Sequence, residues 1–141
     1  MEKKLQILVV EDDHLQARDL RHELETELAA EVRVISTEHE FRQALPGLAK
    51  EPPDVAIFDR MVRWANPARD MPSTPQAEWD PEQAGLRCAE LIEANRNGRK
   101  IAILLFSVIG DDGDGGGFEC ITKESDFDNL ITRIREILQP D

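Results

Sequence analysis

The sequence ILVVEDD, residues Ile7–Asp13, places a nearly continuous apolar run directly before three acidic residues. A second run of this kind, PDVAIFD at Pro53–Asp59, also ends in an acid, and a third, IAILLF at Ile101–Phe106, is wholly apolar. Strands whose two faces are both covered read as continuous apolar runs. These three segments are therefore predicted to be the central strands of a sheet, the first over 5–10, the second over 54–58 and the third over 101–106.

Two further runs, at 31–35 and 118–121, are shorter or mixed with polar residues, as expected of edge strands. Helical patterns separate all five runs, and this alternation indicates a parallel sheet wound with helices. We number the five strands in chain order, so that the strand at 31–35 is strand 2 and the strand at 54–58 is strand 3. Right-handed crossovers then favour the order 2-1-3-4-5. The predicted fold class is α/β, a flavodoxin-like, doubly wound five-stranded parallel sheet.

The predicted helices have apolar stripes and recognisable starts. Thr37 followed by Glu40 reads as a capping box, and Asp80 before Pro81 and Ser125 with Asp128 are further candidate caps. The expected inward residues of the four helices are Leu20, Leu24 and Leu28; Phe41, Ala44, Leu45 and Leu48; Ala84, Cys88, Leu91 and Ile92; and Phe127, Leu130, Ile131, Ile134 and Leu138.

Length and charge limit the function further. A chain of 141 residues is expected to form a single domain over 1–141. Its net charge of −12 repels nucleic-acid phosphates and suits a partner with a basic patch. No apolar run reaches membrane-spanning length, and the apolar run at the start is too short for a signal peptide. Cys88 and Cys120 form no disulfide framework, so a cytoplasmic location with reduced thiols is expected.

Acidic residues meet at one edge of this predicted sheet. Ligand sites of such sheets lie beyond the carboxyl ends of the strands, where the order reverses between the strands at 5–10 and 54–58. Glu11 and Asp12 follow the strand at 5–10, and Asp59 follows the strand at 54–58. Such an oxygen-rich cluster favours a hard divalent cation, and Mg²⁺ suits it best because it shares its coordination with phosphate. Ser107 and Lys123 end the last two strands at the same rim, which makes the set typical of a phosphoryl-transfer site.

The chain resembles the receiver domain of bacterial two-component response regulators, as an atypical stand-alone member. The segments that carry the resemblance are ILVVEDD, PDVAIFD, Ser107 after the apolar run that ends at Phe106, and Lys123 in the run CITK. The resemblance implies that Asp59 is the phospho-acceptor. It implies that Asp12 binds Mg²⁺ directly and Glu11 through water, with the backbone carbonyl of Met61 completing the protein's share together with Asp59. It further implies that Ser107 and Lys123 contact the phosphoryl group.

The resemblance also implies a role in signalling. The phosphoryl donor would be a phosphohistidine on a sensor histidine kinase or a histidine phosphotransfer protein, and the output would be contact with another protein. A carrier in a multistep phosphorelay is a close variant. The chain would not be an enzyme beyond the phosphorylation and slow dephosphorylation of its own Asp59, since apolar Met61 and Ile109 flank the site by analogy.

The chain departs from the family pattern in three places. A long insertion at 60–80 precedes the third helix, and Arg63 stands near the place of a frequent proline. A Gly/Asp-rich loop at 110–117 occupies the position of the fourth helix, which we expect to be reduced or missing because glycine disfavours helices. Cys120 replaces the family's switch aromatic. The long loop, in place of the fourth helix, is therefore expected to carry the signal.

Other interpretations remain open. A non-phosphorylated pseudo-receiver that acts as a protein-binding module accounts for the degraded fourth helix. A haloacid-dehalogenase-like phosphatase needs a DxD motif, whereas Asp59 is followed by Arg60 and Met61. Asp13 is expected to cap the first helix rather than to bind a metal. The tract at 110–117 fails EF-hand spacing and reads as a solvated loop.

Overall fold

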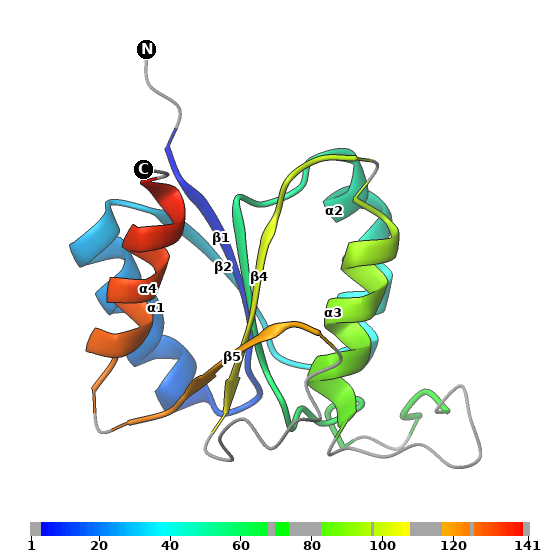
Figure 1. Ribbon diagram of the computed structural model, residues 1–141. Helices are drawn as coiled ribbons and strands as arrows, with labels where there is room; N and C mark the ends of the chain where they lie inside the picture. The colour runs from blue at the N-terminus through cyan, green and yellow to red at the C-terminus, as the bar shows by residue number, and fades with distance from the viewer. Residues whose placement is uncertain are drawn as a thin grey trace.

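The computed structural model describes residues 4–67, 70–73, 83–96, 98–107, 117–124 and 126–139. Strands and helices alternate over most of the described residues, and Figure 1 shows them as one sheet with helices on both faces. In chain order they are β1 (Gln6–Val10), α1 (His14–Leu28), β2 (Glu31–Ile35), α2 (Glu38–Lys50), β3 (Val55–Asp59), α3 (Ala84–Ala94), β4 (Ala102–Ser107), β5 (Glu119–Thr122) and α4 (Asp128–Leu138).

The five strands are all parallel and lie in the order β2-β1-β3-β4-β5, which confirms the predicted topology. The register aligns Val10 of β1 with Phe58 of β3, and Asp59 with Phe106 of β4. The chain order therefore reverses between β1 and β3, and the residues that follow these two strands emerge side by side. That edge of the sheet carries the acids.

Two apolar layers hold the helices on the sheet. Alternate residues of the central strands point to opposite faces: Leu8, Phe58 and Leu105 contact the layer under α2 and α3, whereas Val9 and Ile57 contact the layer under α1 and α4. Figure 1 shows α2 and α3 on one side of the sheet and α1 and α4 on the other. Full burial of each such side chain stabilises the fold by about 1.5–3 kcal/mol. The continuous apolar runs are thus explained by cover on both faces.

Local sequence signals set where the helices start. Asp13 caps α1, and its carboxylate accepts hydrogen bonds from the backbone N–H groups of Leu15 and Gln16, as predicted. Thr37 caps α2 by accepting from the Glu40 N–H at 3.0 Å. The Glu40 carboxylate reaches back one residue further than a capping box requires and accepts from the Ser36 N–H at 3.2 Å.

Most sequence predictions of the fold hold, and two local ones are wrong. Leu138 was expected to pack inward but is 38 % exposed, because it lies in the last turn of α4 and Ile137 packs against the core beside it. Asp128 begins α4 without capping it, and its own N–H donates to the Asp126 carboxylate at 3.1 Å.

Several predictions fall outside the described residues. We expected the helix after β4 to be reduced or missing, and its place, residues 108–116, lies outside the described residues. The helix labelled α4 is a different one: it is the last helix of the chain, which the sequence predicted. The candidate caps at Asp80 and Ser125 also lie outside. The insertion is described over 60–67 and 70–73. Among the helices of the described residues, none is long and apolar enough to cross a membrane.

Candidate functional site

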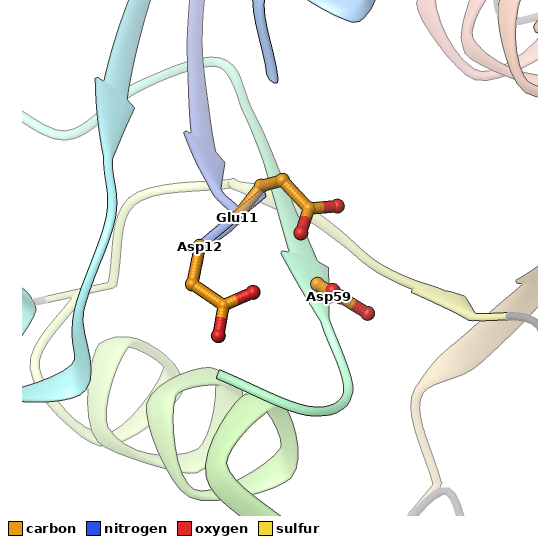
Figure 2. A group of neighbouring side chains, drawn as sticks. All are labelled: Glu11, Asp12 and Asp59. Carbon is orange, nitrogen blue, oxygen red and sulfur yellow. The ribbon is translucent and has the colours of Figure 1, made fainter. Parts of the chain in front are cut away.

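Three carboxylates gather at the ends of β1 and β3. Glu11 and Asp12 follow β1 directly, and Asp59 is the last residue of β3. Each offers one oxygen, and these three atoms lie within 4.8 Å of one another (Figure 2). The parallel pairing of β1 and β3 produces this cluster, since it brings the ends of both strands to one place.

Lys123 brings a positive charge between two of these carboxylates. It follows β5, and its Nζ lies 3.0 Å from Glu11 Oε1 and 3.3 Å from Asp59 Oδ2. The same ammonium donates to the side-chain oxygen of Gln16 at 2.6 Å. The lysine backbone is held as well, because its N–H donates to the Ser107 carbonyl at 2.8 Å. A cation with a side chain only 9 % exposed is thus fixed between two carboxylates.

Glu11 is the most deeply buried acid of the cluster, at 3 % exposure. Burial raises the pKa of Glu11 to about 8, and a shared hydrogen bond with Asp59 and the charge of Asp59 add to the rise. The ammonium of Lys123 opposes these effects without cancelling them. As long as no divalent cation is bound, the site therefore favours the protonated form of Glu11 more strongly than water does.

Asp12 is held by the loop after β3. Its Oδ2 accepts a hydrogen bond from the backbone N–H of Arg63 at 3.0 Å, and the Arg63 Nε lies 3.6 Å from the same oxygen. Asp12 also borders a hollow of about 370 Å³ that this loop lines with Met61, Val62 and Pro67 among others. The insertion after β3 thus forms one wall of the acid cluster.

Gly85 brings the first turn of α3 against the end of β3. A Cβ atom on this residue would lie 2.1 Å from the Asp59 carbonyl oxygen and 2.8 Å from the Arg60 Cα. The Gly85 N–H donates to the Arg60 carbonyl at 2.9 Å. The first turn of α3 therefore packs directly against the backbone of Asp59, and only glycine permits the two backbones to come so close.

The structure brings most of the predicted site residues together. Glu11, Asp12, Asp59 and Lys123 form one contact cluster. Ser107 is buried at the end of β4, directly after the register partner of Asp59, so it lies at the same edge of the sheet. Met61 is half exposed two residues after Asp59 and lines the hollow beside Asp12.

Three residues of this site were not predicted: Gln16, Arg63 as a partner of Asp12, and Gly85. Gln16 lies in the first turn of a helix that follows the acids directly, and this position was a usable signal. Arg63 stands where the resembled family often has proline, which has no N–H to donate. The missing proline therefore pointed to a backbone donor near the acids. For Gly85 no local signal existed, because its neighbour is a backbone atom of another element.

The residues present fit a hard divalent cation. Three carboxylates, from two adjacent strand ends, offer oxygen ligands within one small volume, and two of them are open enough to share a cation with water. The cluster holds no cysteine or histidine ligand. Oxygen ligands alone suit Mg²⁺ rather than a softer metal.

No protein-family model matches this sequence, and no curated protein is similar enough to it to count as a relative. Solved structures do match over nearly the whole chain. A putative response regulator from Chloroflexus aurantiacus superimposes with a TM-score of 0.69 at 22 % identity, covering 96 % of this chain and 98 % of the other. A CheY-like response regulator receiver domain protein from Methanospirillum hungatei has a TM-score of 0.69 at 20 % identity, covering 96 % and 94 %.

A third similar structure was solved with a bound metal ion. The receiver domain of a sensor histidine kinase from Pseudomonas aeruginosa, solved with a magnesium ion coordinated in its active site cleft, has a TM-score of 0.64 at 19 % identity, covering 97 % of this chain and 96 % of the other. This chain therefore has the fold of the response-regulator receiver domain, and its acidic cluster lies at the carboxyl edge of that fold.

Proposed function

We propose that this chain is a single phospho-acceptor domain, over 1–141, that works as the switch of a two-component phosphorelay. Asp59 receives the phosphoryl group from a phosphohistidine on a sensor histidine kinase or a histidine phosphotransfer protein. The modified domain then signals by contact with another protein. This function is carried by one observation: a lysine ammonium bridges Asp59 and Glu11, 3.3 Å and 3.0 Å away, beside a third carboxylate.

Asp59 is the group that reacts. One of its carboxylate oxygens attacks the phosphorus, the bond from phosphorus to the donor's imidazole nitrogen breaks, and the electron pair of that bond returns to the nitrogen. No general base is needed at Asp59, because a carboxylate attacks without losing a proton. The work of the protein is alignment and neutralisation of charge.

The surrounding residues have separate roles. Glu11, Asp12, Asp59 and the backbone carbonyl of Met61 would hold Mg²⁺, which when bound neutralises the charge that the carboxylates and the phosphoryl oxygens bring together. Lys123, already 3.3 Å from Asp59, pairs with a phosphoryl oxygen after transfer. Ser107 donates its hydroxyl to another phosphoryl oxygen from the end of β4.

The proposed location and partners follow from the same function. A domain that exchanges phosphoryl groups with a histidine kinase works in the cytoplasm. Its net charge of −12 disfavours nucleic acid as the direct partner and favours a protein with a basic surface. The domain modifies only itself, so it is not an enzyme in the usual sense, and apolar Met61 beside the site slows the attack of water on the aspartyl phosphate.

The test is phosphorylation by a small donor. The wild-type chain is incubated with acetyl phosphate and Mg²⁺, and intact mass is measured. We expect the mass of one phosphoryl group to be added to the wild type and none to Asp59→Asn. Asp54→Asn is the matched control, because Asp54 lies at the other end of β3, where it accepts a hydrogen bond from the Gln6 N–H at 2.8 Å. This variant should be phosphorylated like the wild type.

Two results would overturn the proposal. A wild-type chain that gains no phosphoryl group with acetyl phosphate or with a phosphorylated kinase would favour a pseudo-receiver that acts by binding alone. Equal labelling of the wild type and Asp59→Asn would place the acceptor elsewhere.

A further inference from the structure

Arg63 contacts the acid cluster in two ways at once. Its backbone N–H donates to Asp12 Oδ2 at 3.0 Å, and its guanidinium Nε lies 3.6 Å from the same oxygen. Asp12 is one of the three carboxylates that converge at the strand ends. A positive side chain of the protein itself thus lies beside one of the carboxylates that a divalent cation would use.

The same short segment also caps helix α2. The Arg63 carbonyl accepts the N–H of Glu38 at 2.9 Å, and the Trp64 carbonyl accepts the N–H of His39 at 2.8 Å. These N–H groups belong to the first turn of α2, where no carbonyl of the helix itself can reach them. The loop therefore holds the start of α2 through its backbone.

Side chains reinforce that attachment. Trp64 is 5 % exposed, its ring packs edge-to-face with the His39 ring at 5.2 Å between centroids, and the Arg42 guanidinium lies 5.6 Å from the Trp64 ring centroid. Its indole N–H donates to the Pro72 carbonyl at 2.9 Å. A movement of the Arg63–Trp64 segment would change the surroundings of a buried indole and of the first turn of α2.

We propose that Arg63 competes with the divalent cation for Asp12, and that loading of the acid cluster shifts the Arg63–Trp64 segment where it caps α2. This inference rests on the proposed function, since it concerns the same site. A cation bound to Asp12 neutralises the carboxylate, so the Arg63 N–H and guanidinium are attracted to it less strongly. The positive charge of the cation also repels the guanidinium. The cation-bound population is therefore the one in which Arg63 has left Asp12. By linkage, whatever holds the segment on α2 weakens cation binding.

The size of the effect follows from exposure. The Arg63 side chain is 48 % exposed and that of Asp12 is 24 % exposed, so the ion pair is a surface pair of modest strength. Removal of the guanidinium should tighten Mg²⁺ binding about two- to five-fold at low ionic strength. The gain should shrink as salt is added, because salt screens exposed charges.

The experiment titrates Mg²⁺ into the full chain, with calorimetry for affinity and tryptophan emission for the segment. Trp79→Phe is the background for both, because the chain has two tryptophans and this change leaves Trp64 as the sole indole. Arg63→Ala and Arg63→Gln are compared with Arg99→Ala, which removes an exposed arginine before β4, at the opposite edge of the sheet.

We expect Mg²⁺ to change the Trp64 emission, both Arg63 variants to bind Mg²⁺ more tightly, and Arg99→Ala to bind like its parent. Unchanged or weaker affinity in the Arg63 variants would overturn the inference, as would an emission that does not respond to bound Mg²⁺. If Asp59 is still phosphorylated in those cases, the proposed function survives. If no variant binds Mg²⁺, both the inference and the metal site are wrong.

Discussion

Gly85→Ala tests whether the first turn of α3 sets the position of Asp59. The added Cβ would lie 2.1 Å from the Asp59 carbonyl oxygen and 2.8 Å from two further backbone atoms, the Asp59 carbonyl carbon and the Arg60 Cα. No flexible side chain is involved, so the conflict cannot be relieved by a rotamer change. Either α3 or the end of β3 has to move.

The geometry gives the scale of the cost. Ordinary contact begins at 3.4 Å, so the two segments must separate by about 1.3 Å along that contact. Forcing extra volume into a packed site costs about 1–3 kcal/mol, and a backbone neighbour places this case at the upper end. Alanine recovers up to about 1 kcal/mol of helix propensity. The net loss in free energy of unfolding should be about 2 kcal/mol.

Gly47→Ala is the matched control. Gly47 is exposed within α2, and a Cβ there would meet no atom within 4 Å. The same chemical change should therefore raise the free energy of unfolding by up to about 1 kcal/mol. If Gly→Ala lowers the free energy of unfolding at Gly85 and raises it at Gly47, the loss at Gly85 comes from the contact with Asp59 and not from helix propensity.

Urea unfolding followed by circular dichroism measures both variants, and acetyl phosphate labelling reports on Asp59. Gly85→Ala should lower the urea midpoint and slow phosphorylation, whereas Gly47→Ala should do neither. A Gly85→Ala protein as stable as the wild type, with unchanged labelling, would refute the argument that α3 supports the acceptor.

Two further predictions concern buried carboxylates. The folded pKa of Glu11, about 8 against 4.5 for a free side chain, means that the folded state binds more protons than the unfolded state between these values. Without divalent cations, the free energy of unfolding should therefore fall as pH rises from about 5 to about 8, by at most about 1.4 kcal/mol per pH unit. Glu11→Gln should lose that part of the slope, and urea titrations in which both proteins keep the same slope would contradict it. Glu38 is fully buried and accepts two hydrogen bonds from Arg87, at 2.9 and 2.8 Å, and others from Arg42. Glu38→Ala should cost about 3 kcal/mol because it removes a buried carboxylate that accepts hydrogen bonds from two guanidiniums. Glu25→Ala, which breaks an exposed ion pair on α1, should change the free energy of unfolding by less than about 1 kcal/mol in the same urea titration. Equal losses of stability in the two variants would count against the role of burial.

The loop after β3 has a larger structural role than a surface insertion. It lines the hollow beside Asp12, it donates a backbone N–H to Asp12, and it caps α2. The expectation that this loop carries the signal stays a prediction, and the Trp64 titration is its first test. The contacts give that prediction a route, from Asp12 through Arg63 to the first turn of α2.

The sequence by itself determined the strands, their order and the three acids. Continuous apolar runs mark strands covered on both faces, and a residue that directly follows such a strand must lie at the carboxyl edge of the sheet. Glu11, Asp12 and Asp59 could be grouped on that basis without coordinates. The caps at Asp13 and Thr37 were equally local, since each acts on N–H groups two or three residues away.

Only the tertiary structure decided what surrounds the acids. Arg63 reaches Asp12 across 51 positions, and Arg87 reaches Glu38 across 49. Gly85 is required by a carbonyl on another element. Periodicity tells which side of a strand or helix a residue lies on, but the path of a loop and the approach of two backbones depend on the sum of many distant contacts, which no local pattern encodes.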